Sequence, residues 1–279
     1  MQTILGATGQ IAVELARELR RTHTRDLRLV SRSPRKVNDG DVLAPADLLD
    51  ARQALEAVKG SRIVYFTAGL PPDTALWEAQ FPVMLKNALD ATRAAGAKFV
   101  YFDNTYMYPQ DDRVLTEDAP FEPVGRKGRV RAAMASAVLE EMARGDIPVV
   151  IGRAPEFYGP GKTQSITNAL VIDRLKAGRT PRVPVRDDTR RTLIWTPDAS
   201  RALAAEAFGV APSYQVVGRW ALTAAGLVSR QVRELRELLS RYAYDNLFDA
   251  SKFKRRFPGF EVTGYAQGLA LIRQEQGRR

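Results

Sequence analysis

The chain has 279 residues, room for one large domain or two modest ones, and 45% of them are hydrophobic, as in an ordinary globular core. It contains no cysteine, which excludes disulfides, a thiol nucleophile and a cysteine-based metal site, and we expect its single histidine, His23, in a surface loop rather than on a metal. The formal net charge is +10, but basic and acidic residues are interleaved, so we expect no nucleic-acid partner and attribute the charge to phosphate-bearing ligands and solubility.

The first motif joins a short apolar strand, residues 3–5, to an amphipathic stretch that predicts a helix. Between them lies Gly-Ala-Thr-Gly-Gln-Ile-Ala at residues 6–12, a Gly-x-x-Gly-x-x-Ala spacing in place of the commoner Gly-x-Gly-x-x-Gly. Glycines let the backbone approach a pyrophosphate closely, and the N–H groups and dipole of a helix N-terminus favour its charge. This context favours dinucleotide binding over an ordinary strand–helix turn. The expected cofactor contacts are Gly6, Thr8, Gly9, Gln10 and Ile11.

The second strand, residues 27–30, indicates which dinucleotide is bound. An NAD-binding protein normally places a carboxylate about 20 residues past the glycines, on the ribose 2′-hydroxyl. This strand instead ends in Ser31 and Arg32, and Arg35 and Lys36 follow. A guanidinium group suits a 2′-phosphate by its charge and its fork of donors. We therefore predict that Ser31 and Arg32 bind NADP(H) in preference to NAD(H); the alternative is a solvated basic loop.

Strands and helices alternate along the next hundred or so residues. The pattern predicts a helix from Asp47 to Gly60, a strand over 63–66, a helix over 77–95, a strand over 98–102, a helix over 130–143 and a strand over 148–151. Such alternation is typical of an α/β fold with a Rossmann-type doubly wound parallel sheet. We expect this dinucleotide-binding domain over residues 1–155. A smaller, interleaved α/β substrate lobe is expected over 156–279, with residues 214–217 returning to the main sheet.

Polar and aromatic residues follow the predicted strand ends. Ligands of doubly wound sheets bind at the carboxyl ends of the strands, so these residues are expected at one edge of the sheet. They are Thr67, Ala68, Gly69, Asn104, Thr105, Tyr106, Glu156 and Tyr158.

Short motifs occur in order along nearly the whole chain. They are residues 6–9, Arg32, 46–48 (Ala-Asp-Leu), Asn87, 99–101 (Phe-Val-Tyr), 107–109 (Met-Tyr-Pro), 153–161 (Arg-Ala-Pro-Glu-Phe-Tyr-Gly-Pro-Gly), 196–199 (Thr-Pro-Asp-Ala) and 248–253. In order and spacing they resemble the extended or atypical short-chain dehydrogenases/reductases of the NAD-dependent epimerase/dehydratase kind. The resemblance implies that Asp47, beside Leu48, binds the adenine amine and that the backbone of 67–69 lines the ribose. It also implies that the loop at 158–160 covers the nicotinamide.

The chain departs from this family at the catalytic pair, which is usually Tyr-x-x-x-Lys with a Ser or Thr from the preceding strand end. Counting back from Arg153 by the family spacing places Lys127 at the Tyr position and Arg131 at the Lys position. Asn104, with Thr105 beside it, stands at the Ser/Thr position. The resemblance thus implies that Arg131 also contacts the nicotinamide ribose. An alternative register places Val124 and Gly128 at the two catalytic positions, where neither side chain could act as an acid or a base.

Helical spacing supports the first register. The predicted helix carries an apolar stripe. In steps of four residues towards the N-terminus, this stripe leads to Arg131 and then to Lys127, on the same inward face. The stripe consists of Ala135, Val138, Leu139 and Met142. Two cations at the start of a buried stripe are costly unless an anionic or polar group meets them. The alternative is a helix that starts later, with both side chains in solvent.

A buried Lys127 could protonate a carbonyl oxygen as hydride arrives from NADPH, because burial and the charge of Arg131 both favour the neutral amine. Tyr106 and Tyr158 are the reserve proton donors, with packing beneath the cofactor as the alternative role. Thr105, Glu156 and Tyr158 are expected to contact the substrate.

Three functions are compatible with this sequence. We expect an NADP(H)-dependent oxidoreductase acting on a small carbonyl or alcohol, with Lys127 and Arg131 replacing the usual Tyr and Lys. The alternatives are a catalytically silent NADP(H)-binding sensor and a sugar-nucleotide epimerase or dehydratase. No apolar run nears the roughly 20 residues of a membrane helix, and no signal peptide precedes the first strand. We therefore expect a cytoplasmic protein with a small-molecule substrate and no membrane partner; a homodimer is compatible with the sequence.

Overall fold

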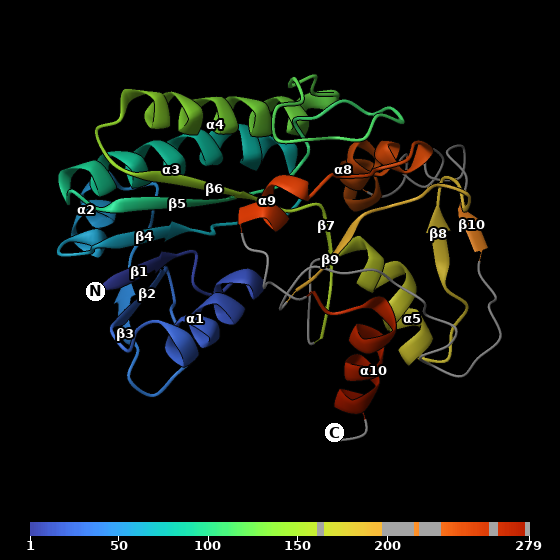
Figure 1. The fold of residues 1–279 in the computed structure, drawn as a ribbon, viewed down its shortest axis with the longest axis horizontal. Helices are drawn as coiled ribbons and strands as arrows, with labels where there is room; N and C mark the ends of the chain where they lie inside the picture. The colour runs from blue at the N-terminus through green and yellow to red at the C-terminus, as the bar shows by residue number, and fades with distance from the viewer. Residues whose placement is uncertain (161–164, 197–214, 218–229, 257–261, 277–279) are drawn as a thin grey trace. The chain divides into compact units, whose positions relative to one another are not determined.

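The computed structural model describes residues 1–160, 165–196, 215–217, 230–256 and 262–276 (Figure 1). The chain divides into two compact units. The first comprises Met1–Met107 and Val124–Arg153, and the second comprises Tyr108–Pro123 and Ala154–Arg279. The second unit is therefore assembled from two separate stretches of the chain.

A six-stranded parallel sheet forms the centre of the first unit (Figure 1). Its strands are β1 (Gln2–Leu5), β2 (Leu27–Ser31), β3 (Val42–Pro45), β4 (Ile63–Phe66), β5 (Lys98–Asp103) and β6 (Val149–Arg153). They lie in the order β3-β2-β1-β4-β5-β6, and all neighbours are parallel. The chain builds outward from β1 to β3 and then crosses to β4, the strand order of doubly wound dinucleotide-binding folds. The predicted Rossmann-type sheet is confirmed.

Helices cover both faces of this sheet (Figure 1). They are α1 (Gln10–Thr22), α2 (Ala51–Val58), α3 (Thr74–Ala94) and α4 (Gly125–Arg144). A smaller core packs α1 against β1 and β2, and a larger one packs α2, α3 and α4 against the opposite face. Because both faces are covered, β1 is buried along its whole length. Within the described ranges, no helix is long and apolar enough to span a membrane.

Helix α4 starts at Gly125 rather than at residue 130, and Gly145, at φ 76°, ends it. The early start places Lys127 and Arg131 on the buried face, with 0% and 5% of their surface exposed. Their predicted inward orientation is confirmed, and the alternative of two solvated cations is wrong.

The predicted apolar stripe of α4 is only half correct. Ala135 and Val138 are buried, but Leu139 and Met142 are each 40% exposed. In the last turns the inward position belongs instead to Glu141, which is 0% exposed. It tolerates burial because its carboxylate forms ion pairs with Arg93 and Arg144.

Two helix starts and one strand also differ from prediction. Helix α2 begins after Asp50, not at Asp47, because the Asp50 carboxylate accepts the N–H groups of Arg52 and Gln53. Helix α3 begins before residue 77 because Asp73 caps it. Strand β3 was not predicted: it is a four-residue edge strand, largely exposed, and lacks the apolar alternation that marks a strand.

The second unit contains two small parallel sheets. Strand β7 (Glu156–Tyr158) pairs with β9 (Leu193–Trp195), and β8 (Arg182–Pro184) pairs with β10 (Gln215–Val217). The prediction that 214–217 return to the main sheet is wrong, because β10 pairs with β8; Tyr214 itself lies outside the described residues. The helical elements are η1 (Asn168–Ile172), α5 (Asp173–Lys176), α8 (Arg230–Leu239), η2 (Ser240–Ala243), α9 (Ser251–Arg256) and α10 (Tyr265–Gln276).

Of the motif residues named above, Gly161 and residues 197–199 also lie outside the described part of the chain. The core of the second unit consists of Tyr158, Ile172, Trp195, Leu269 and Ile272. A Cβ added to Gly268 would lie 2.7 Å from the Tyr158 hydroxyl oxygen, so α10 packs there only because the residue is a glycine.

Candidate functional site

The turn between β1 and α1 is held close to the end of β4. Gly6 has φ +86°, and a Cβ on it would lie 2.5 Å from the Cα of Ala68. Only glycine fits this position, since both the backbone conformation and the space exclude a side chain. The N–H groups of Gly6 and Ala7 donate to the Val30 carbonyl at 2.9 and 3.0 Å. The turn is thereby fixed to the ends of β2 and β4.

The N-terminus of α1 follows this turn and suits an anion. Gly9 occupies the cap position without a side-chain cap, and the first turn contains no acidic residue. Thr8 and Gly9 are exposed, and Gln10 and Ile11 are half-buried. The positive end of the helix therefore offers backbone N–H groups to a phosphate, as a dinucleotide pyrophosphate requires.

The end of β2 offers further donors on the neighbouring strand. The Ser31 hydroxyl oxygen is buried, and no group in the described part of the chain bonds to it. Arg32 is exposed, and the structure as described gives it no ion pair. A buried hydroxyl without a partner is rare in a folded protein and indicates a missing one. The exposed group at this strand end is therefore the Arg32 guanidinium, with no acidic residue at positions 31–36.

Asp47 and Leu48 lie in the loop that follows β3. The Asp47 carboxylate accepts the Leu49 N–H at 3.0 Å, and the Asp47 N–H donates to the Gln53 side chain at 3.0 Å. The buried Asn87 side chain donates to the Leu48 carbonyl at 2.9 Å, so α3 anchors this loop. The motif residue Asn87 therefore positions the loop predicted to hold the adenine.

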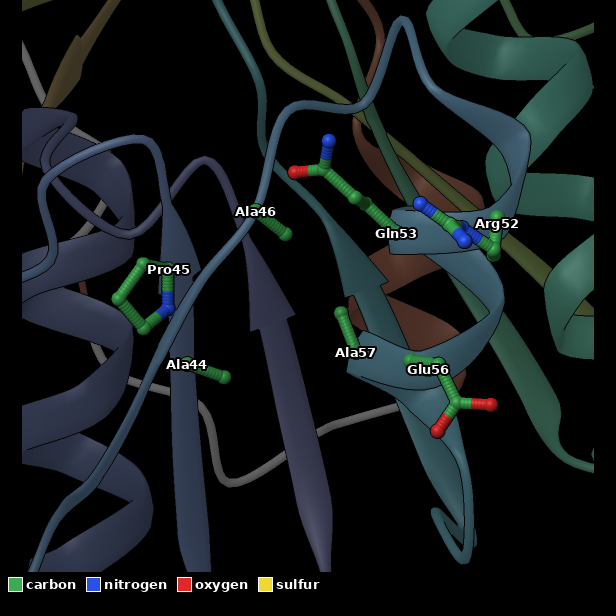
Figure 2. Close-up of a pocket in the computed structure, with 7 residues that line it drawn as sticks. All are labelled: Ala44, Pro45, Ala46, Arg52, Gln53, Glu56 and Ala57. Atoms are coloured by element: carbon green, nitrogen blue, oxygen red, sulfur yellow. The ribbon is translucent and has the colours of Figure 1, made fainter.

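A surface hollow of about 420 Å³ lies between β3 and α2, beside this loop (Figure 2). Its lining consists of Ala44, Pro45, Ala46, Arg52, Gln53, Glu56 and Ala57. Sequence reasoning could not find it, because β3 carries no strand signal. The Gln53 side chain on its rim holds the Asp47 backbone, which connects the hollow to the predicted adenine loop.

The loop after β4 is the third segment at this edge. The Thr67 N–H and hydroxyl both donate to the Leu5 carbonyl, at 3.0 and 2.9 Å. Ala68 contacts the Gly6 turn as described, and Gly69 is exposed. The structure thus brings the predicted residues 67–69 to the glycine turn.

The ends of β5 and β6 carry a buried charge cluster. The Asp103 carboxylate is 0% exposed and lies 2.7 Å from Arg131 Nη2 and 3.4 Å from Arg153 Nε. One carboxylate therefore faces two guanidinium groups. Arg131 Nε has no hydrogen-bond partner among the described residues, although it is buried.

Aromatic rings surround Arg131. Its guanidinium carbon lies 5.2 Å from the Phe81 ring centre and 5.8 Å from that of Tyr101. Burial works to lower the pKa of Arg131, but interaction with Tyr101 and Asp103 outweighs it and holds this pKa above its ordinary value. Burial also raises the pKa of the Tyr101 hydroxyl. Arg131 is therefore a permanent buried cation.

Lys127 lies one turn earlier on α4. Its Nζ donates to the Thr74 hydroxyl at 2.6 Å and lies 6.0 Å from the centre of the Trp77 ring. Both partners belong to the first turn of α3, which the sequence did not assign to the site. The only available signal was Asp73, a helix-capping residue type directly before them.

Residues 104–106 form a tight turn after β5. The Asn104 N–H donates to the Asp103 carboxylate at 2.9 Å, and the Tyr106 N–H donates to the Asn104 side chain at 3.1 Å. Thr105 is buried, whereas Asn104 and Tyr106 are half-buried. The Tyr106 ring stacks on Trp77, with 6.2 Å between ring centres and 19° between planes. The structure thus brings Asn104, Tyr106, Lys127 and Arg131 to one place.

Glu156 and Tyr158 belong to the second unit. Glu156 accepts hydrogen bonds from Thr167 at 2.6 Å, from Arg191 at 3.1 Å and from the Tyr242 hydroxyl. Tyr158 is 0% exposed and packs in the core of that unit. The surroundings of Tyr158 favour packing over proton donation.

Comparison with known proteins decides the family. The sequence model of the NAD dependent epimerase/dehydratase family matches residues 3–207. The chain belongs to this family. The match includes the glycine turn, the Asp47 loop, the β5 end and α4.

A curated relative of this epimerase/dehydratase chain is the uncharacterized protein y4nL of Sinorhizobium fredii. The two are 30% identical over 151 residues, which are 51% of this chain and 42% of that protein. The match thus spans less than half the length of this relative.

Solved structures share the fold of this family member. WbmH from Bordetella bronchiseptica, in complex with NAD⁺, superimposes with a TM-score of 0.73 at 16% identity, covering 99% of both chains. The structure of gox2253 superimposes with a TM-score of 0.77 at 19% identity, covering 100% of this chain and 99% of that one. A GalE-like L-threonine dehydrogenase from Cupriavidus necator superimposes with a TM-score of 0.71 at 17% identity, covering 99% of both chains.

Proposed function

We propose that this protein is an NADP(H)-dependent oxidoreductase that interconverts a small carbonyl compound and its alcohol. The observation that carries the proposal is the end of β2, where Ser31 is followed by the exposed guanidinium of Arg32 and no carboxylate stands beside them. Both follow directly on Val30, the residue whose carbonyl holds the Gly6 turn. A pyrophosphate at the turn and a 2′-phosphate at the end of β2 would therefore bind at neighbouring strand ends.

Different residues of the chain would bind different parts of the cofactor. The α1 N-terminus binds the pyrophosphate, Ser31 and Arg32 bind the 2′-phosphate, Asp47 binds the adenine amine, and the backbone of 67–69 lines the ribose. NADPH, when bound, supplies a hydride. Lys127 and Arg131 stand at the positions of the family's catalytic pair and place two cations beside the nicotinamide end. The structural neighbour WbmH, described in complex with NAD⁺, supports a nicotinamide cofactor.

The cofactor preference is tested by titrating the protein with NADPH and NADH, following nucleotide fluorescence. NADPH is expected to bind more tightly, and Arg32→Ala to remove most of the difference, since a charge-assisted phosphate contact is lost. Arg25→Ala is the matched control: it removes the same charge from an exposed site before β2 and should leave the preference unchanged. Equal dissociation constants for the two cofactors in the unmutated protein would refute the proposed specificity.

Oxidoreductase activity is tested with NADPH and a panel of aldehydes, ketones and 2-oxo acids. Consumption of NADPH with one class of carbonyl supports the proposal. Tight NADPH binding without turnover on any member would favour the second candidate, an NADP(H)-binding sensor. The observation that favours a sensor is that Lys127 and Arg131 both hydrogen-bond to protein groups, Thr74 and Asp103.

A further inference from the structure

The loop between β3 and α2 is closed by a ring of hydrogen bonds. One carboxylate oxygen of Asp50 caps α2 by accepting the N–H groups of Arg52 and Gln53, at 2.9 and 3.1 Å. Its other carboxylate oxygen accepts the side-chain amide of Gln53 at 3.0 Å. The Asp50 N–H donates to the Asp47 carbonyl at 3.1 Å, and the Asp47 N–H donates to the side-chain oxygen of Gln53 at 3.0 Å. Both ends of the Gln53 amide therefore bind within this loop.

The side chain of Gln53 makes a longer-range contact than helix capping needs. In a capping box, the residue three positions after the N-cap bonds to the backbone N–H of the N-cap itself. Gln53 stands three positions after Asp50, but the Asp50 N–H is already bonded to the Asp47 carbonyl. The Gln53 side chain instead reaches the N–H of Asp47. Figure 2 shows its amide extending from α2 to the chain segment beyond Ala46. Gln53 thus fixes a loop residue in addition to the helix end.

Two further contacts hold the same loop from other elements. The Ala46 N–H donates to the Ser31 carbonyl at the end of β2, at 2.9 Å. The buried Asn87 side chain on α3 donates to the Leu48 carbonyl, also at 2.9 Å. These contacts fix the residues before and after Asp47, whereas Gln53 acts on the backbone of Asp47 itself.

The Asp47 carboxylate keeps one oxygen for a ligand. One of its oxygens accepts the Leu49 N–H at 3.0 Å, which orients the carboxylate against its own turn. The other oxygen bonds to no group in the described part of the chain, and Asp47 is only half-buried. The loop therefore presents an anchored carboxylate oxygen that can accept a hydrogen bond from outside.

We propose that Gln53 is a positioning residue that makes the dinucleotide site select adenine over hypoxanthine, by holding Asp47 in the orientation that accepts the adenine amine. The proposal rests on the proposed function, which assigns Asp47 to that amine. An ionised carboxylate only accepts hydrogen bonds. The amine of adenine satisfies it, whereas hypoxanthine carries a carbonyl oxygen at the same ring position and sets two acceptors against each other. Selection requires a fixed Asp47, because a mobile carboxylate could turn away to water.

The test compares NADPH with its hypoxanthine analogue, in which a carbonyl oxygen replaces the adenine amine. Titration followed by nucleotide fluorescence gives both dissociation constants. The unmutated protein should bind NADPH about tenfold more tightly or better, since the analogue loses a hydrogen bond to a charged group. Gln53→Leu should bring the ratio of the two constants close to one. It should leave the preference for NADPH over NADH unchanged, because that preference depends on Arg32.

Two matched variants separate positioning from a general effect on the helix. Gln53→Asn keeps the amide but is one methylene shorter, so it cannot reach Asp47 and should behave like Gln53→Leu. Arg52→Leu removes the neighbouring exposed side chain, which has no hydrogen bond or ion pair among the residues that the structure describes, and should keep the full selectivity. Thermal unfolding of each variant checks that it is folded. Full selectivity in folded Gln53→Leu, or an equal loss in Arg52→Leu, would overturn the role of Gln53.

Amide hydrogen exchange gives a readout that needs no cofactor. In the free protein, Gln53→Leu should speed exchange of the Asp47 N–H about fivefold, as the loss of a hydrogen bond of ordinary strength implies. The Ala54 N–H, which donates to the Asp50 carbonyl at 3.0 Å inside α2, is the internal control and should change little. Unchanged exchange at Asp47 would show that Gln53 does not hold this residue, and would overturn the inference.

The outcomes also separate this inference from the proposed function. If NADPH and its hypoxanthine analogue bind the unmutated protein equally well, the inference is overturned and the proposed function stays intact. If the protein binds neither nucleotide, the proposed function is refuted, and the role of Gln53 in selecting the base is refuted with it.

Discussion

Asp103 is a buried carboxylate in the interior of the first unit. It is the single carboxylate between Arg131 and Arg153, and all three side chains are largely removed from water. A buried ion pair contributes little net stability while intact, but removing one partner leaves an uncompensated buried charge. Asp103 therefore acts as an obligatory counter-ion and not as a substrate acid.

Asp103→Asn is expected to lower the free energy of unfolding by about 3–5 kcal/mol, because two guanidinium groups lose their anion. Urea unfolding followed by circular dichroism measures this loss. Asp39→Asn, at an exposed site, should change stability by less than about 0.5 kcal/mol. Similar losses in the two variants would show that the charge cluster is not a structural requirement.

At the scale of elements, an ion pair between Arg93 on α3 and Glu141 on α4 joins the two helices. The Arg93 guanidinium, and to a lesser extent Arg144, hold the pKa of this carboxyl below its usual range despite its burial. A carboxyl whose pKa is lower in the folded protein stabilises the fold above its unfolded pKa of about 4.3. That stabilisation is lost as the pH falls through the lowered pKa that Glu141 has in the folded protein.

Glu141→Gln should therefore lower the unfolding temperature at neutral pH and flatten its decline between about pH 5 and pH 3. Glu140→Gln is the matched control, since it is the exposed neighbour on the same helix. Calorimetry across this pH range makes the comparison. If the unfolding temperature of Glu141→Gln still falls as steeply with acid pH as that of the unmutated protein, the ion pairs of Glu141 with Arg93 and Arg144 do not account for the decline.

The elements also show where sequence reasoning works and where it fails. The sequence predicts the apolar strand β1, which is buried along its whole length, and the end of helix α2 near Gly60, because burial and chain geometry require those residue types. Strand β3 was missed because an exposed edge strand has no such requirement. The neighbours Thr74 and Trp77 of the candidate site were missed because packing between α3 and α4, not local sequence, brings them to Lys127.

At the scale of the whole molecule, the contacts proposed for the pyrophosphate, the 2′-phosphate, the adenine amine and the ribose beside residues 67–69 all belong to the first unit, on four separate loops. NADPH is expected to slow amide hydrogen exchange in residues 6–12, 31–32, 46–48 and 67–69 together, since one ligand would order all of them. Exchange measured by mass spectrometry with and without NADPH checks this pattern. Protection confined to the second unit would place the cofactor elsewhere.

The second unit takes one of its pieces, Tyr108–Pro123, from the middle of the chain. There the Leu115 N–H donates to the Leu247 carbonyl, and the Asp112 carboxylate accepts the Asp245 N–H across 133 positions of sequence. During synthesis on the ribosome, this piece emerges long before its partners Leu247 and Asp245, so its backbone groups stay unpaired while residues 1–107 and 124–153 can already fold. Once residue 153 has left the exit tunnel, the nascent chain contains every strand of the six-stranded sheet. The loops proposed to hold the cofactor are then complete before the second unit has been synthesised to its end.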